Sequence, residues 1–127
     1  MMEEFQGSKP IYLQLMERIQ RQIIRRELQV GDKLPSVREM AIQSGVNPNT
    51  VQRTYAELER EGIVESRRGQ GTFVTENKEA LSQLRDQLKR EEIKNFIQNM
   101  TEMGFDSEEI MVGLEECLKS EQKEREK

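Results

Sequence analysis

The segment SVREMAIQSGVNPNTVQRTY, residues 36–55, has the spacing of two short helices joined by a tight turn. Ser36 followed three residues later by Glu39 is a capping box, the pair that satisfies the first backbone N–H groups of a helix. Gly45 suits the end of that helix, because glycine adopts the left-handed conformation of a helix C-terminus without steric cost. The sequence therefore predicts a first helix over residues 36–45.

A second helix is predicted over residues 47–61. Asn47 is a favourable N-cap, and Pro48 stands at the first helical position, where its missing N–H does no harm. Apolar residues repeat on one face of this helix: Val51, Tyr55 and Leu58. Polar residues fall off that face: Asn49, Thr50, Gln52 and Arg53. Such a helix suits DNA base edges and phosphates, although an ordinary helical hairpin with a solvated polar face has the same pattern.

Residues 63–75, IVESRRGQGTFVT, predict a β-hairpin next to the helices. β-Branched and aromatic residues at both ends have strand composition, and the glycines between them permit a tight tip. Arg67 and Arg68 stand beside Gly69 at this tip, and two adjacent cations are costly to place there without an anion. A helix–turn–helix followed by a hairpin is a winged helix, whose basic wing can reach a minor groove or phosphates; a solubilising surface loop is the alternative.

The residues before the capping box complete a small domain over residues 1–75. A helix over about residues 10–27 is predicted by apolar residues at helical spacing, which are Tyr12, Leu15, Met16, Ile19 and Ile23. We interpret this helix as a core support that could bring one or two arginines to the phosphate backbone. Residues 28–35 form an extended strap, and residues 1–8 have no pattern beyond that of a loose arm.

Residues 76–127 predict two amphipathic helices, over about residues 77–103 and 106–120. Two thin helices cannot bury both apolar stripes on their own, so they need the winged domain or a second copy of the chain. We favour dimerisation over a dedicated effector pocket, because a pocket of about 300 Å³ or more needs a thicker segment. The predicted dimerisation residues are Leu81, Leu84, Leu88, Phe96, Ile97, Met100, Ile110, Leu114 and Leu118.

The charge of the chain differs between these two segments. The whole sequence has a net charge of −4, but residues 1–75 carry 11 Lys and Arg against 10 Asp and Glu, which is +1. Residues 76–127 carry 9 against 14, which is −5. Nine of the eleven cations in the first segment are Arg, which pairs with phosphate and guanine in a bidentate way. The negative total does not exclude nucleic acid as a partner, because binding depends on the local field.

The composition disfavours several classes of function. The chain has no His, a single Cys and no glycine-rich phosphate loop, so the sequence offers no catalytic group, metal site or cofactor site. We interpret that residue, Cys117, as a buried small apolar side chain rather than a redox switch. The sequence has no secretory signal and no apolar run of transmembrane length, which predicts a cytoplasmic protein without a membrane partner.

An ordered run of motifs resembles the GntR family of bacterial winged-helix transcriptional regulators. The motifs that carry the resemblance are LPSVREMA at residues 34–41, GV at 45–46, NTV at 49–51, Leu58, EGIV at 61–64 and GQGTFV at 69–74. PIY at 10–12, NPNTVQ at 47–52 and the short two-helix tail are most similar to the YtrA-type subfamily, whose members lack a large ligand-binding domain. The resemblance implies a homodimeric repressor, often one that acts on genes for membrane transporters.

The family's DNA contacts, carried over by position, fall on Arg38, Asn47, Asn49, Thr50, Gln52 and Gly69. Gly69 matches the wing glycine that enters the minor groove, and Arg68 stands where some relatives have a polar or basic residue. Arg53 and Arg67 are added to this set by their charge and their place in the second helix and at the hairpin tip.

Two positions depart from the family pattern, since many members have Arg in place of Pro48 and of Gln52. Losing these cations should weaken guanine contacts. If Gln52 reads a base, its amide matches adenine. The operator should then differ from that of the relatives that carry Arg.

These patterns together predict a mainly α-helical protein with a small β-hairpin wing, in which a winged helix–turn–helix domain precedes a short two-helix dimerisation segment. The predicted function is that of a homodimeric, sequence-specific transcriptional repressor that binds a palindromic operator in double-stranded DNA. The alternative is a winged-helix domain that docks another protein without sequence-specific DNA binding. The sequence requires no small-molecule effector, and the operator and regulated genes stay open.

Overall fold

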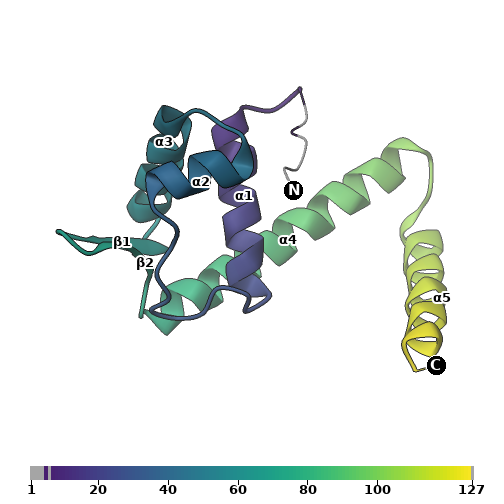
Figure 1. The fold of residues 1–127 in the computed structure, drawn as a ribbon. Coiled ribbons are helices and arrows are strands. Elements are labelled where there is room, and N and C mark those ends of the chain that lie inside the picture. The colour runs from purple at the N-terminus through teal and green to yellow at the C-terminus, as the bar shows by residue number, and fades with distance from the viewer. Residues whose placement is uncertain (1–4, 6, 127) are drawn as a thin grey trace. The chain divides into compact units, whose positions relative to one another are not determined.

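The chain folds as a winged helix–turn–helix followed by two long helices, which confirms the predicted fold class (Figure 1). The computed structural model describes residues 5 and 7–126. Its elements, in order, are α1 (Ile11–Ile24), α2 (Val37–Ser44), α3 (Pro48–Arg60), β1 (Val64–Arg67), β2 (Gly71–Val74), α4 (Lys78–Glu102) and α5 (Ser107–Arg125). The chain divides into two compact units, residues 1–86 and 87–127. The expected loose arm over residues 1–8 falls mostly outside the described residues.

Helix α3 lies at the centre of the first unit, where it contacts α1, α2 and β1 (Figure 1). Its apolar face packs into a core to which α1, the strap before α2 and both strands also contribute. The largest fully buried side chains of this core are Leu15, Ile19, Leu34, Leu58, Val51, Val64, Val74 and Thr54. Because burial of apolar surface is the dominant stabilising term in folding, α3 is held in place by the best-packed part of the unit.

The turn between α2 and α3 has the local geometry that the sequence predicts. The Ser36 hydroxyl accepts from the Glu39 N–H at 3.1 Å, and the Glu39 carboxylate accepts from the Ser36 N–H at 3.0 Å. The hydrogen bond from the Ser36 N–H, followed by the contact with the Ser36 side chain, holds the pKa of Glu39 below its ordinary value of 4.5. Gly45 ends α2 with a φ of 67°, and Asn47 caps α3. The capping box and both caps are therefore confirmed.

The wing is an antiparallel pair of strands whose edge is covered by the strap before α2. Strand β1 pairs with β2, and Val64 lies opposite Val74. The strap pairs with β2 through the Leu34 N–H, which donates to Thr72 O at 2.8 Å, and the Val74 N–H, which donates to Asp32 O at 2.8 Å. The sequence predicts that the strap is extended but not that it pairs, because pairing between distant segments leaves no local pattern.

Helix α1 ends at Ile24, earlier than the expected end near residue 27. Arg26 follows with a φ of 64°, a left-handed conformation that cannot continue a helix. Nη1 of Arg85, in the first turns of α4, donates to the Ile24 carbonyl at 3.3 Å. Leu84 beside it is only 4% exposed. The first unit therefore extends into α4 as far as residue 86, beyond the change in composition near residue 75.

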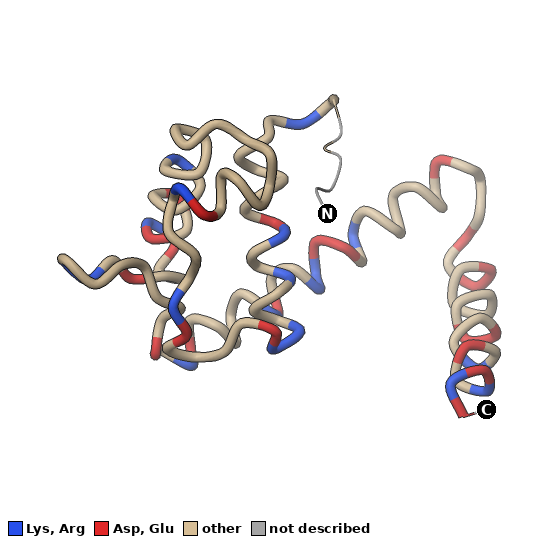
Figure 2. The backbone as a smooth tube through the Cα atoms, viewed as in Figure 1, with Lys and Arg blue, Asp and Glu red and all other residues tan. Residues whose placement is uncertain are grey.

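The second unit consists of the rest of α4 and of α5. Helix α4 is continuous from Lys78 to Glu102, close to the predicted residues 77–103. Gly104 follows it with a φ of 94°, and Asp106 caps the start of α5 through a capping box with Glu109. Helix α5 runs to Arg125, past its expected end near residue 120. The charged residues in the first part of α5 are all acidic, and Lys and Arg join them toward its C-terminal end (Figure 2).

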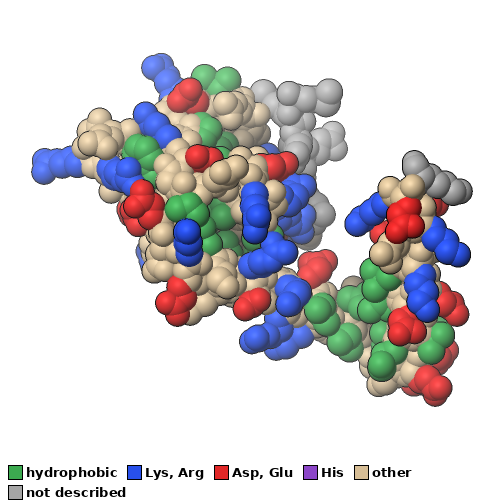
Figure 3. Space-filling view, turned by 90° about the horizontal axis from the view of Figure 1, so that it is seen from below, with side chains coloured by type: hydrophobic (Ala, Val, Ile, Leu, Met, Phe, Trp, Pro, Cys, Tyr) green, Lys and Arg blue, Asp and Glu red, His purple; other side chains and the backbone are tan. Residues whose placement is uncertain are grey.

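Most of the large apolar side chains of the second unit are exposed (Figure 3). Ile110 is buried and Leu88 and Met100 are half-buried, but the exposed ones form a set that we call the apolar surface of the second unit. Its members are Ile93, Phe96, Ile97, Met103, Phe105, Met111, Val112, Leu114 and Leu118. Exposed apolar surface of this extent is typical of an interaction site rather than of a finished monomer.

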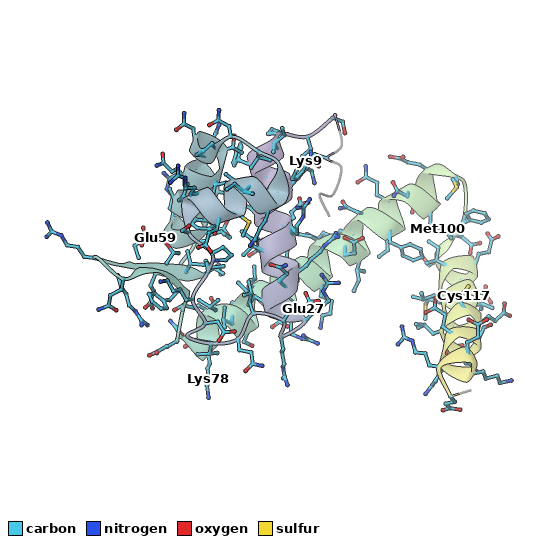
Figure 4. All side chains as sticks on the ribbon, in the orientation of Figure 1. Lys9, Glu27, Glu59, Lys78, Met100 and Cys117 are labelled. Carbon is cyan, nitrogen blue, oxygen red and sulfur yellow. The ribbon has the colours of Figure 1, made fainter. Side chains whose placement is uncertain are left out.

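Cys117 is exposed on α5 (Figure 4), which corrects the expectation of a buried side chain. The expectation assumed that α5 buries its apolar residues within one chain. Leu114, one turn earlier on the helix, is itself 45% exposed. Cys117 is therefore exposed because this side of α5 is not covered within the unit.

Candidate nucleic-acid interface

Helix α3 presents a polar face on the side away from its buried residues. Thr54 is fully buried in the core, and its hydroxyl is satisfied, since its one proton is donated to Thr50 O at 2.9 Å, with Tyr12 O at 3.4 Å as a second, longer acceptor. The exposed side chains that we call the polar face of α3 are Asn49, Gln52 and Arg53. Their exposure follows from the helical repeat, which turns them outward when the apolar residues face the core.

The other residues of the helix–turn–helix that are predicted to contact DNA differ in exposure and in the hydrogen bonds that they already make. Arg38 is exposed in the first turn of α2 and makes no hydrogen bond or ion pair with another described residue. Asn47 is exposed, but its side-chain oxygen accepts from the Asn49 N–H at 2.8 Å, which fixes the side chain as a cap and leaves its amino group as the unused donor. Thr50 is half-buried. Arg38 is thus available to an anion, whereas Asn47 has a structural role as a cap.

Arg53 stacks on an aromatic ring from another helix. Its Cζ lies 3.7 Å from the centroid of the Tyr12 ring, in the first turn of α1. Tyr12 is half-buried, although the apolar repeat of the sequence assigns it to the core. No local signal links Tyr12 to a residue so far along the chain, so sequence reasoning missed this neighbour of the polar face.

The two arginines of the wing have different surroundings. Arg67 lies over the Phe73 ring, 4.3 Å from Cζ to the centroid, and forms ion pairs with Glu65 at 3.9 Å and Glu76 at 3.7 Å. Arg68 is exposed and makes no hydrogen bond or ion pair within the described part of the chain. Basic residues lie near the tip of the hairpin (Figure 2). The sequence does not distinguish the two arginines. Most of the partners of Arg67 come from other parts of the chain, and only the fold brings them close.

Contacts from other elements hold the wing. The Ser66 N–H donates to the Glu59 carboxylate of α3 at 2.7 Å (Figure 4). Lys33 of the strap lies against β2, since its Cε is 2.9 Å from where a Cβ on Gly71 would be. At the tip, Gly69 has a φ of 75° and open space around it, which leaves room for a groove wall. Lys33 is therefore a further cation near the wing, one that the sequence places only in the strap.

The chemistry of this surface is hydrogen bonding and charge pairing. Side-chain amides can read base edges, and Arg and Thr can donate to phosphates. Over residues 5 and 7–126, no cluster of three His, Cys, Asp or Glu is arranged to hold a metal ion. In the same part of the chain, no helix is long and apolar enough to cross a membrane.

A family model described as "Bacterial regulatory proteins, gntR family" matches residues 11–74, from the start of α1 to the end of β2. The chain belongs to the GntR family. GntR proteins are transcription regulators and not enzymes, so the polar face of α3 and the wing lie in a DNA-binding domain. The predicted family and the predicted absence of enzymatic activity are confirmed by this membership.

Two proteins of Bacillus subtilis (strain 168) resemble this GntR protein well beyond the winged domain. The HTH-type transcriptional regulator YhcF is 57% identical over 111 residues, which are 87% of this chain and 92% of YhcF. The HTH-type transcriptional repressor YtrA is 40% identical over 105 residues, which are 82% of this chain and 81% of YtrA. The resemblance to the YtrA-type subfamily is therefore confirmed.

Solved structures are similar both to the whole chain and to its winged domain alone. A GntR family transcriptional regulator from Listeria monocytogenes has a TM-score of 0.83 and 40% identity, covering 88% of this chain and 98% of its own. The DNA-binding domain of AraR, solved in complex with operator ORX1, has a TM-score of 0.55 and 31% identity, covering 58% of this chain and 96% of its own. A winged domain similar to this GntR domain has thus been seen on DNA.

Proposed function

We propose that this GntR protein is a homodimeric repressor that binds a palindromic operator in double-stranded DNA. The observation that carries the proposal is the polar face of α3, which exposes two amides and a guanidinium, together with the exposed Arg38 of α2. The similarity to the repressor YtrA over both segments of the chain supports repression as the outcome. Genes for membrane transporters are the proposed targets, and the cytoplasm is the proposed place of action.

The helix–turn–helix supplies the contacts to the major groove. Asn49 and Gln52 read base edges, and their amides match the N6 and N7 groups of adenine. Arg38 and Arg53 bind backbone phosphates, and Thr50 adds a hydroxyl donor to a phosphate. Phosphate contacts fix the register of the protein on the duplex, so that the amides meet the same base pairs each time.

The wing supplies contacts beside the major groove. Arg68 and Gly69 place its tip in the minor groove, where basic side chains are favoured. Arg67 contributes less, since two carboxylates already offset its charge. Asn47 serves mainly as the cap of α3 and adds only its free amino group.

The apolar surface of the second unit is the proposed dimer interface. Leu84 and Ile110 are buried within one chain, so the interface falls on the remaining predicted residues. Of these, Phe96, Ile97, Leu114 and Leu118 belong to the apolar surface of the second unit. The half-buried residues Leu81, Leu88 and Met100 of α4 extend the proposed interface beyond it. A symmetric dimer presents two copies of α3, and a palindromic operator mirrors that symmetry.

Selection from a pool of random duplexes by the purified full-length chain tests this function. We expect an enriched inverted repeat, with half-site centres about 10 base pairs or a multiple of that spacing apart. Gln52→Ala should relax the preference at one position of each half-site, whereas Arg38→Ala should weaken binding to all sequences alike. Failure to enrich any sequence at low salt would favour the alternative, a winged domain that docks another protein.

A further inference from the structure

Tyr12 and Arg53 form a stacked pair that joins α1 to the polar face of α3. The Arg53 Cζ lies 3.7 Å from the centroid of the Tyr12 ring, and Arg53 is exposed while Tyr12 is half-buried. A stacked guanidinium gives one face to the ring and keeps the N–H groups along its edge for hydrogen bonds. The pair therefore presents a set of donors beside the amides of α3.

Among the described residues, no carboxylate takes up the donors of Arg53. Glu57, one turn further along α3, pairs with Arg60 at 3.1 Å instead. A second stacked arginine, Arg67 over Phe73, differs because two carboxylates offset its charge. An exposed guanidinium without an acidic partner, on the face that meets DNA, is suited to an anion, and phosphate is the anion that a duplex presents.

The backbone at Tyr12 is tied to the same core that holds α3. Tyr12 O accepts from the Thr54 hydroxyl at 3.4 Å, and Thr54, next to Arg53 in the chain, is fully buried. The stack thus spans two elements that cannot separate without opening the core. An arginine that is held in place before binding loses less conformational freedom when it meets a phosphate.

We propose that Tyr12 is a positioning residue, which holds the Arg53 guanidinium ready for one DNA backbone phosphate at the edge of the polar face of α3. The inference rests on the proposed DNA-binding function and adds to it a residue outside the helix–turn–helix. Arg53 makes the contact, and Tyr12 acts through Arg53.

The number of phosphate contacts can be read from the salt dependence of binding. We measure fluorescence anisotropy of a labelled mixed-sequence duplex of about 30 base pairs with the full chain over a range of salt concentrations. Arg53→Gln should reduce the slope of log affinity against log salt by about 0.9 per bound chain. Arg60→Gln removes a paired arginine from the same helix and should leave the slope unchanged. An unchanged slope for Arg53→Gln, or an equal change in both variants, would overturn the proposal.

The role of Tyr12 is tested by asking whether its effect requires Arg53. Tyr12→Leu should weaken binding about two- to five-fold in the wild-type chain. The same substitution should have no effect on binding in the Arg53→Gln chain, because the stack is already lost there. Tyr12→Phe keeps the ring and should bind like the wild type. An equal loss from Tyr12→Leu in both backgrounds would show a purely structural role and would overturn the proposal.

Arg53→Lys keeps the test decisive if Tyr12→Leu does not fold, because it changes only an exposed side chain. Lysine keeps the charge but lacks the planar fork that stacks, so the salt slope should remain while the affinity falls. An unchanged affinity would contradict the positioning role. If the wild-type chain binds no duplex even at low salt, the proposed function itself is wrong. That measurement is made before the variants are compared, so the two failures can be distinguished.

Discussion

Among single residues, Tyr55 shows how one side chain sets the relation between the two helices of the motif. Its hydroxyl donates to Pro35 O at 2.7 Å, which ties the middle of α3 to the residue before the cap of α2. Burial raises the pKa of the Tyr55 phenol, and the charge of Glu39 adds to the effect. The phenol therefore remains protonated at neutral pH and keeps donating its hydrogen bond.

Tyr55→Phe is expected to lower the free energy of unfolding by about 0.5–1.5 kcal/mol, because the Pro35 carbonyl loses its donor. Urea denaturation at neutral pH measures the change. Tyr12→Phe is the matched control, since the Tyr12 hydroxyl has no hydrogen-bond partner in the described part of the chain. Equal losses in the two variants would mean that the bond to Pro35 adds nothing specific.

Among the elements, the wing is the one most dependent on its neighbours. Strand β2 pairs with β1 on one edge and with the strap on the other, and the Ser66 N–H donates to Glu59 of α3. These contacts orient the wing relative to α3, so that a duplex can meet both elements together. The tip beyond them carries Arg68 and Gly69, which have open space around them.

Arg68→Gln is expected to reduce the salt slope of DNA binding by about 0.9 per chain, because one phosphate contact is lost. Arg67→Gln should change the slope less, since Glu65 and Glu76 already offset its charge. Exposed ion pairs contribute about 0–1 kcal/mol each, so the Arg67→Gln chain should still fold. Salt titrations of both variants with one duplex make the comparison. A larger change for Arg67→Gln would show that DNA displaces its carboxylate partners.

Signals that act within a few residues made the elements predictable. Ser36 and Asn47 cap the helices that directly follow them, so their positions alone indicate both helix starts. The pairing of Leu34 with β2 and the cap that Arg85 gives to α1 join distant segments, and no spacing in the sequence reports them. The end of α1 was missed for the same reason.

The candidate site divides in the same way. Helical periodicity predicts that Asn49 and Gln52 face outward, because the apolar positions of α3 leave them no other side. The stack of Arg53 on Tyr12 depends on how α1 crosses α3. The partial neutralisation of Arg67 likewise depends on a carboxylate from beyond β2. The outward orientation of these side chains could be predicted from the sequence, but the partners that the fold brings to them could not.

At the scale of the whole molecule, the apolar surface of the second unit is the feature that a single chain leaves exposed to solvent. Leu114 is 45% exposed and Leu118 is 58% exposed on α5. Covering such side chains gains roughly 25 cal/mol for each Å² of apolar area removed from water. A second copy of the chain provides a matching surface by symmetry.

Leu114→Glu is expected to split the dimer, because a charge in an apolar interface loses its water without gaining a partner. Analytical ultracentrifugation should show a monomer, and the salt slope of DNA binding per complex should fall to about half. Ser120→Glu adds the same charge at an exposed polar position of α5 and should leave the dimer intact. Circular dichroism should show an unchanged winged domain in both variants. A Leu114→Glu chain that remains dimeric would place the interface elsewhere.

The stoichiometry of the protein on its selected duplex tests the dimeric repressor most directly. Native mass spectrometry of the wild-type chain with a duplex that carries the enriched repeat should show two chains on one duplex, with little of any complex that holds a single chain. A complex dominated by one chain per duplex, or the absence of any complex at low salt, would contradict a symmetric dimer that reads DNA through α3 and the wing.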